Sequence, residues 1–412
     1  MKRFFSFILL FFALVGTIHA QIHSGKHGSP QAEQGSAGID VSLWKNSSTQ
    51  RNDSTGSTSF NLGILSSMNS LKGVGINLLG AIVRRDANGI QAAGLWNIVG
   101  GRVCGIQSAG IANINGSLVG LSISGLVGIT GNNARGVTLS GLVNMSGNRS
   151  RSVSIGGLLN INGEDAAGIQ LAGLTNISGG SLKGFSCAGL LSVVGKNLYG
   201  AQLSVFANIT AANMTGIQLS GIGNAVGGTA KGVQIGAANM AIHAEGLQIG
   251  LVNYYKESMN GFQLGLVNAN PLTKVQLMLF AGNTSKLNAG VRFKNKLFYT
   301  ILGGGTHYLD FGSKFSAALF YRAGLELPLY KQLFVSGDLG FQHIETFKNK
   351  NHGIPARLYA LQARVNLEYR LTARTGVFLS GGYGGSRYYT QNKGYERGVI
   401  AEGGVVFNVS SK

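Results

Sequence analysis

The feature that most constrains the fold is a phrase of about sixteen residues that recurs through the middle of the chain. Residues 168–178 read GIQLAGLTNIS, residues 216–226 read GIQLSGIGNAV, and residues 246–253 read GLQIGLVN. Thirteen such units, mostly sixteen residues apart, begin at Gly75, Gly89, Gly105, Gly120, Gly136, Ser152, Gly168, Gly184, Gly200, Gly216, Gly232, Gly246 and Gly261. A repeat of this period predicts an array of like structural units, each stable only against its neighbours.

Each position within the unit has its own chemistry. The first and third residues after the start are apolar and enclose a polar residue, as at Gln107, Gln170 and Gln218. Five residues after the start glycine recurs, at Gly94, Gly110, Gly141, Gly173, Gly189 and Gly221. Eight residues after the start come Asn113, Asn144, Asn160, Asn176 and Asn208. Alternation with period two, interrupted by glycine and asparagine turns, predicts β-strands.

Two architectures accommodate such a strand repeat. In a β-solenoid each unit is one coil, equivalent residues stack at about 4.8 Å, and the array forms a rod of roughly 60 Å. The apolar columns would then fill the interior, glycine would allow tight corners, and asparagine would form a side-chain ladder. In the alternative, each unit is one antiparallel strand, and repeats and C-terminal strands close one large β-barrel. Like residues recur without odd–even alternation, which favours the solenoid. Residues 60–66 resemble a degenerate first copy.

The N-terminal residues predict an exported protein. Lys2 and Arg3 precede the apolar run FFSFILLFFALVG, and Ala20 is a suitable cleavage position, so residues 1–20 have the pattern of a secretory signal peptide. The polar residues 21–58 are expected to form a flexible leader. Later in the chain, no run of eighteen apolar residues predicts a membrane-spanning helix.

The sequence pattern changes after residue 271, where the sixteen-residue repeat ends. Residues 59–271 are therefore assigned to the repeat array and residues 272–412 to a second domain of about eight strands. These strands are expected at residues 275–284, 287–294, 297–308, 314–327, 333–346, 357–371, 375–389 and 397–409. Ten of the thirteen tyrosines also lie beyond residue 271.

Two of these segments alternate clearly between an apolar and a charged face. They are FSAALFYRAGLEL and RLYALQARVNLEYRLT, and their charged faces carry Arg322, Glu326, Arg364, Glu368 and Arg370. An apolar face on long strands predicts an antiparallel transmembrane β-barrel with the five charges in an ion-paired lumen. About eight strands leave room for side chains and none for a channel. A soluble antiparallel sheet with one hydrated face is the alternative.

Little in the sequence indicates catalysis. The 65 glycines make near-matches to phosphate loops common, and none has dinucleotide-binding or P-loop spacing. The histidines do not cluster at metal-ligand spacing, and no Ser/His/Asp set or carboxylate pair falls on one expected face. Cys104 and Cys187 are expected to be small core residues, since a disulfide requires their repeats to touch. We therefore expect no enzyme, no cofactor and no metal site.

The charge balance bears on partners. The formal net charge is +19, and residues 272–412 carry 18 Lys and Arg against 7 Asp and Glu. An exported basic chain is suited to outer-membrane lipid, to anionic envelope polysaccharide or to another envelope protein. Nucleic acid is not an expected partner.

The repeat columns resemble those of exported surface-repeat proteins of Gram-negative bacteria. Such proteins carry tandem Gly-apolar-Gln-apolar-x-Gly-apolar-x-Asn units behind a signal peptide, and here the pattern covers about residues 75–268. The C-terminal part looks like a small outer-membrane β-barrel. Its last residues, FNVSSK, depart from the terminal aromatic residue typical of such barrels, so Phe407 would have to serve in its place.

The resemblance implies an outer-membrane or cell-surface location and supplies no catalytic residues. We expect a non-enzymatic cell-envelope protein, in which the repeat array is a scaffold or interaction surface and the barrel is a membrane anchor. Two alternatives stay open: an outer-membrane pore or transporter, and an envelope polysaccharide-binding solenoid.

Overall fold

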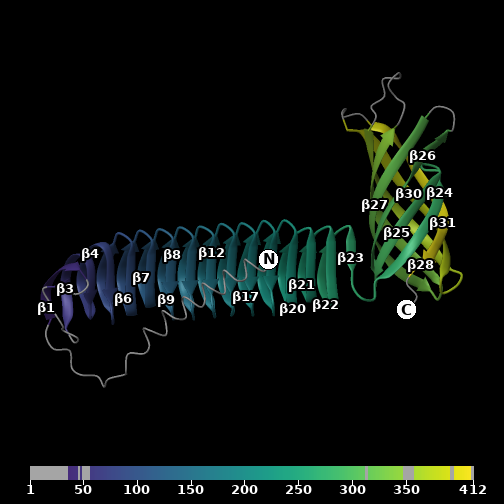
Figure 1. Cartoon of the computed structure of the whole chain (residues 1–412). Helices are drawn as coiled ribbons and strands as arrows, with labels where there is room; N and C mark the ends of the chain where they lie inside the picture. The colour runs from purple at the N-terminus through teal and green to yellow at the C-terminus, as the bar shows by residue number, and fades with distance from the viewer. Residues whose placement is uncertain are drawn as a thin grey trace. The chain divides into compact units, whose positions relative to one another are not determined.

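The computed structural model describes residues 36–44, 47–48, 56–310, 314–346, 357–389 and 394–409. The predicted signal peptide lies outside these residues. The chain divides into two compact units, residues 1–204 and 205–412, and the division falls within the repeat array. The fold is all-β, with a parallel β-solenoid of about 13 turns and a closed antiparallel barrel of eight strands, which confirms the expected fold class (Figure 1).

The described strands correspond first to the sixteen-residue repeats and then, after residue 271, to the segments in which apolar and polar residues alternate. Those of the first unit are β1 (Ser36–Trp44), β2 (Ser47–Ser48), β3 (Ser57–Met68), β4 (Ser70–Val83), β5 (Ala87–Ala93), β6 (Trp96–Ala109), β7 (Ala112–Ser124), β8 (Val127–Thr130), β9 (Ala134–Ser140), β10 (Val143–Ser146), β11 (Ser150–Gly156), β12 (Leu159–Asn162), β13 (Ala166–Ala172), β14 (Thr175–Ser178), β15 (Leu182–Ala188), β16 (Leu191–Val194) and β17 (Leu198–Ser204). Those of the second unit are β18 (Ala207–Thr210), β19 (Met214–Ser220), β20 (Gly223–Ile235), β21 (Ala238–Ile249), β22 (Val252–Leu264), β23 (Val267–Ala269), β24 (Lys274–Gly282), β25 (Leu287–Asn295), β26 (Phe298–Asp310), β27 (Lys314–Tyr330), β28 (Leu333–Thr346), β29 (Arg357–Arg370), β30 (Thr375–Tyr388) and β31 (Gly394–Asn408).

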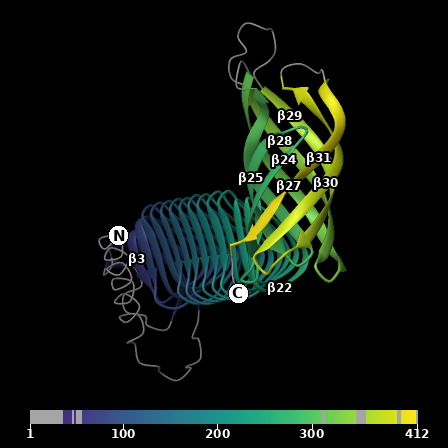
Figure 2. The same ribbon diagram turned by 90° about the vertical axis from the view of Figure 1, so that its right-hand side faces the viewer.

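Each sixteen-residue repeat forms one coil. In residues 166–181 the long strand β13 is followed by a corner at Gly173 and then by the short strand β14. The long strand β13 pairs in parallel with β11 and β15, and Gly168 stands in register with Ser152 and Gly184. The period is therefore sixteen because each residue stacks on its own equivalent in the next coil (Figure 2).

Both glycine columns are required by close backbone contact between coils. At the start of a coil Gly184 has a φ of +135°, and a Cβ there would lie 2.1 Å from the carbonyl oxygen of Gly168. At the corner, a Cβ would come within 1.9–2.3 Å of the preceding coil's carbonyl oxygen at each of Gly94, Gly110, Gly141, Gly173, Gly189 and Gly221. At these glycines a side chain would collide with the neighbouring coil, and the positive φ at Gly184 also favours glycine.

The solenoid interior reverses the expected polarity. Gln170 is 4% exposed, whereas its apolar neighbour Ile169 is 40% exposed, and the same holds for Gln218 and Ile217. The expectation that both apolar columns fill the interior is therefore wrong. Alternation shows which residues share a face but not which face turns inward. Amides can occupy the interior because they find hydrogen-bond partners there, Ser178 of the same coil for Gln170 and Gln234 of the next coil for Gln218.

One apolar column does lie inside, two residues before the unit start. Its larger members are Leu71, Val103, Leu118, Leu182, Leu198 and Met214, all nearly inaccessible to solvent. The two cysteines are not part of the interior: Cys104 is exposed, Cys187 is half-buried, and both are free thiols. The expectation that they are core residues is wrong, because both stand on outward-facing columns.

The array starts earlier than the sequence columns indicated. Strand β1 pairs in parallel with β3, so residues 36–44 do not belong to a flexible leader. Residues 38–42 read GIDVS and repeat the phrase with Asp40 in the glutamine column, a copy that sequence reasoning missed. The degenerate copy at residues 60–66 is confirmed by the pairing of β3 with β4. In that next coil Gly73, and not Gly75, aligns with Gly89.

The barrel closes without the repeats. Strand β24 pairs with both β25 and β31, and β24–β31 follow the eight expected strand ranges closely. The alternative of one large barrel is wrong, because the repeat strands are parallel to one another and belong to a separate sheet. The outward face is apolar over most of the barrel, as shown by the exposed side chains of Leu277, Leu319, Leu325, Leu339, Leu361, Val365, Leu379 and Val399.

Candidate functional site

The barrel lumen gathers the charged residues that alternation placed on the inner face. Arg322, Glu326, Arg364 and Glu368 are all buried, at 2–4% exposure. The fifth predicted charge, Arg370, lies at the end of β29, and its side chain is 26% exposed. All five side chains belong to ion pairs, and they fall into two clusters.

Glu402 on β31 organises the first cluster. Arg322 donates from Nη1 to Oε2 at 2.8 Å and from Nη2 to Oε1 at 3.1 Å. Arg364 donates from Nη2 to Oε1 at 3.2 Å. A single carboxylate therefore holds two guanidinium groups, one of them in the bidentate geometry that gives arginine–carboxylate pairs their strength.

Glu326 and Glu368 organise the second cluster. Arg292 donates a hydrogen bond to Glu368 at 2.6 Å. Glu326 accepts hydrogen bonds from Lys294 and, at 3.5 Å, from Arg370. Arg364 and Glu368 thus belong to different clusters, although they lie four residues apart on one strand face. Their closest ionic partners, Glu402 and Arg292, come from other strands, because residues four apart along a strand are separated by roughly 13 Å.

Between the clusters stands the carboxylate of Asp338. It accepts hydrogen bonds from the Tyr299 hydroxyl at 3.0 Å and from the Asn366 amide at 2.7 Å. The Arg322 guanidinium also lies 4.7 Å from the ring centroid of Phe280 and 4.9 Å from that of Phe320. Aromatic rings and ion pairs therefore pack the lumen together, and the charges have partners that offset their loss of water.

The lumen lining is almost balanced in charge. Four carboxylates face the cations Arg292, Lys294, Arg322, Arg364 and Arg370. At one end of the barrel a hollow of about 320 Å³ is lined by Lys274, Lys294, Lys296, Phe334 and Arg370 among others. Elsewhere in the lumen, side chains of both clusters bond across the interior, as expected of the narrow space inside eight strands.

Sequence reasoning missed four of the lumen charges: Arg292, Lys294, Asp338 and Glu402. A signal was present, because Arg292 and Lys294 alternate with Val291 and Phe293 in GVRFKN. Asp338 and Glu402 stand beside glycine in their strands, which interrupts the alternation with a residue that has no side chain to assign to either face.

The predicted asparagine ladder is present in the solenoid. Asn113, Asn144, Asn160, Asn176 and Asn208 each donate from Nδ2 to a backbone carbonyl of the next coil at 2.7–2.8 Å. Asn144, Asn160 and Asn208 also donate to the stacked asparagine one coil on, at 2.9–3.2 Å. Because each amide bonds to the next coil, asparagine at the same position in successive coils stabilises the stack.

The predicted glutamines line the same interior. Gln107 donates to Gln91 at 3.3 Å, and Gln218 accepts from Gln234 at 2.9 Å. Gln170 instead donates to the Ser178 hydroxyl within its own coil, at 3.2 Å. The hydrogen bonds of these glutamines thus run both along the rod and across it.

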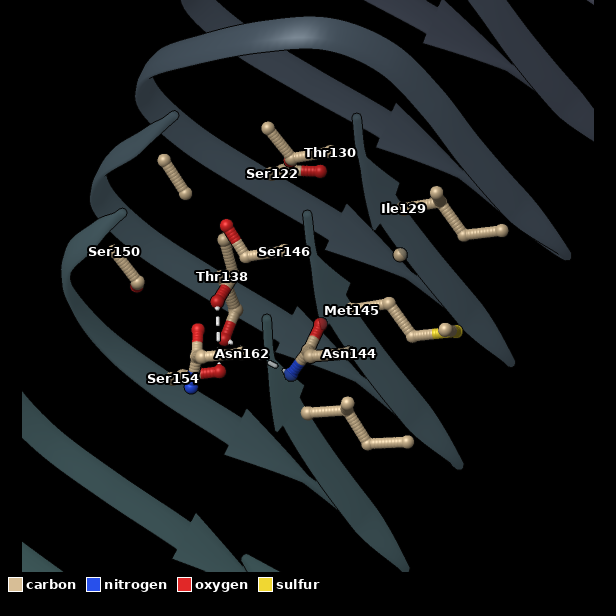
Figure 3. A pocket seen from close by; sticks show the side chains of 13 residues that line it. Ser122, Ile129, Thr130, Thr138, Asn144, Met145, Ser146, Ser150, Ser154 and Asn162 are labelled. Atoms are coloured by element: carbon tan, nitrogen blue, oxygen red, sulfur yellow. Dashed lines mark hydrogen bonds between the residues drawn. The ribbon is translucent and has the colours of Figure 1, made fainter. Parts of the chain in front are cut away.

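A small polar cavity forms where glutamine is replaced by shorter residues. Ser122, Thr138 and Ser154 occupy the glutamine column in three successive coils, and the cavity beside them measures about 10 Å³. Figure 3 shows Thr138, Ser154 and Asn162 close together in it, with Thr138 donating to Ser154 at 3.1 Å. A polar cavity of this size accommodates about one water molecule, and no larger ligand.

Within the described residues, no group of three or more His, Cys, Asp or Glu side chains is placed to hold a metal ion. The same part of the chain has no helix that is long and apolar enough to span a membrane. No protein-family model and no curated protein matches the sequence.

Proposed function

We propose that this protein is a non-enzymatic component of a Gram-negative outer membrane, with the barrel as its anchor and the solenoid as a scaffold or interaction surface. The observation that carries the proposal is the polarity of the barrel: exposed leucines and valines outside, and paired charges inside. Water would favour the opposite arrangement, whereas lipid favours this one.

Strand length and closure support the same conclusion. The barrel strands have 9 to 17 residues, and about 9–11 tilted residues suffice to cross the hydrocarbon core of a bilayer. Closure leaves no unpaired strand edge, which lipid does not tolerate.

The lumen supports an anchor in preference to a pore or transporter. A conducting barrel needs a water-filled passage, whereas here Arg322 and Arg364 both bond to Glu402 across the interior. Side chains in such a network resist displacement from the lumen, because moving one of them would leave buried charges with neither an ionic partner nor water.

Cell fractionation tests the assignment. We expect the full chain in the outer-membrane fraction, retained after a urea wash and migrating differently on a gel when it is not boiled. Recovery in the soluble periplasmic fraction would contradict the proposal. Surface protease treatment of intact and permeabilised cells would then show which side of the membrane carries the repeats.

A further inference from the structure

One edge of the solenoid exposes a continuous ridge of leucines. The leucine ridge consists of the corner residues of five successive coils, which are 38–49% exposed: Leu126, Leu142, Leu158, Leu174 and Leu190. Exposed isoleucines such as Ile155 and Ile169 extend the apolar surface along the long strands beside it. A contiguous apolar surface of this kind marks contact with an apolar partner.

The backbone of the ridge is hydrogen-bonded from coil to coil within the solenoid. The amide of Leu158 donates to the Leu142 carbonyl at 2.8 Å, and the amide of Leu174 donates to the Leu158 carbonyl at 3.0 Å. The amides of Leu142 and Leu190 bond in the same way, at 2.9 Å and 2.8 Å. Hydrocarbon accepts only backbone whose polar groups are satisfied internally, and these corners meet that requirement.

Beside the apolar surface lies a basic groove of about 590 Å³. Its charged lining, called here the arginine groove, consists of Arg102, Arg135, Arg149 and Arg151 with Glu164. Arg135 and Arg151 stand directly opposite each other in the pairing of β9 with β11. In the described part of the chain none of the four guanidinium groups forms a salt bridge. Stacked like charges destabilise a sheet, so an external anion would stabilise this arrangement.

The spacing of the two features matches one leaflet of a bilayer. Arg151 is five strand residues from Gly156, the last residue of β11 before the corner, a rise of roughly 17 Å. One leaflet contributes roughly 15 Å of hydrocarbon to a bilayer. When the ridge enters the acyl chains, the arginines reach the level of the phosphates. A folded protein partner would require no such match.

We propose that the solenoid lies against an anionic lipid bilayer, with the leucine ridge in the acyl region and the arginine groove on headgroup phosphates. The inference rests on the proposed function, since the barrel would hold the chain at the same membrane. It names lipid as the partner of the repeat surface, in the manner of interfacial amphipathic elements.

Depth-dependent quenching on the full chain tests the inference. The background carries Cys104→Ser and Cys187→Ala, and an environment-sensitive fluorophore is attached through Leu158→Cys, Asn132→Cys or Leu339→Cys. Leu339 faces outward on the barrel, and Asn132 is exposed on the turn opposite the ridge. The protein is reconstituted into phosphatidylglycerol–phosphatidylcholine vesicles that contain lipids with a quencher near the acyl-chain end.

We expect strong quenching at positions 158 and 339 and none at position 132. Arg135→Glu with Arg151→Glu should lower quenching at position 158 to roughly half, and leave position 339 unchanged, because each basic residue near an anionic surface contributes to binding. Salt at about 1 M, which shortens the Debye length to about 3 Å, should act in the same direction.

The remaining outcomes separate the two proposals. Quenching at 339 without quenching at 158 overturns the lipid contact and leaves the anchor intact. A label at position 158 that is blue-shifted but not quenched lies in an apolar environment other than lipid. If unlabelled Leu158→Cys chains also form a disulfide with each other, a second copy of the chain covers the ridge, and this result too overturns the lipid contact. Loss of quenching at both positions overturns the proposed function, and the lipid contact with it.

Discussion

At the scale of single residues, the solenoid depends on side chains that serve two coils at once. Asn160 is fully buried, donates to the Leu171 carbonyl and to Asn176, and accepts from Asn144 at 3.2 Å. Asn160→Leu keeps the branched shape of the side chain and removes these bonds, so we expect a loss of about 3 kcal/mol in the free energy of unfolding. Denaturant unfolding followed by circular dichroism measures it.

The matched control is Leu158→Asn, two residues earlier on the exposed corner. Because Leu158 is 39% exposed, this change should alter stability by no more than about 0.5 kcal/mol in detergent. Equal midpoints for Asn160→Leu and the parent chain would show that the ladder does not stabilise the array.

Backbone contact gives a second prediction at this scale. Gly184→Ala places a methyl group 2.1 Å from the Gly168 carbonyl oxygen at a φ of +135°. We expect a loss of about 3 kcal/mol, from strain and from separation of the two coils. Ser152→Ala in the same column should lose about 1 kcal/mol through its bond to Ser150, because that coil already accommodates a Cβ. Limited proteolysis of the repeats reports both changes.

At the scale of elements, the barrel is held from inside by carboxylates shared between strands. Glu402→Leu leaves Arg322 and Arg364 buried without their main partner, and we expect a loss of about 3–5 kcal/mol. The readout is the temperature at which the unboiled, folded band is lost in gel electrophoresis. Ala401→Val, on the adjacent outward position, is the control and should leave that temperature unchanged.

The triple change Arg322→Leu, Arg364→Leu and Glu402→Leu tests the same element differently. It removes the cluster together with its desolvation cost, so the triple variant should recover most of the stability lost by Glu402→Leu alone. If the triple variant were less stable than Glu402→Leu alone, the ion pairs themselves would stabilise the closed barrel. The loss in the single variant would then not come only from leaving two buried arginines without a partner.

At the scale of the whole molecule, the packed lumen predicts electrical silence. In a planar lipid bilayer the reconstituted full chain should give no stable conductance steps, whereas a general porin in the same bilayer should. The reason is that eight strands leave an interior filled by side chains. Regular steps of constant size would favour the pore reading over the anchor.

Much of this architecture follows from the sequence. The sixteen-residue period, the glycine columns and the asparagine column predicted stacked coils, and alternation placed Arg322, Glu326, Arg364 and Glu368 on one face. The copy at residues 38–42 escaped because Asp40 stands where most other coils carry glutamine, serine or threonine. The pairing of Arg364 with Glu402 was equally out of reach, since the two lie on strands separated by a third strand in the barrel.

The sequence alone determined the local geometry, because period and alternation are properties of neighbouring residues: where strands run, where glycine must turn, and which side chains share a face. The tertiary structure decided which face became the inside. Burying Gln170 and exposing Ile169 is favourable only because the folded coil gives the amide a partner in Ser178. The lumen charges are tolerable only when distant strands supply their counter-ions. Those partners exist only once the chain has closed on itself.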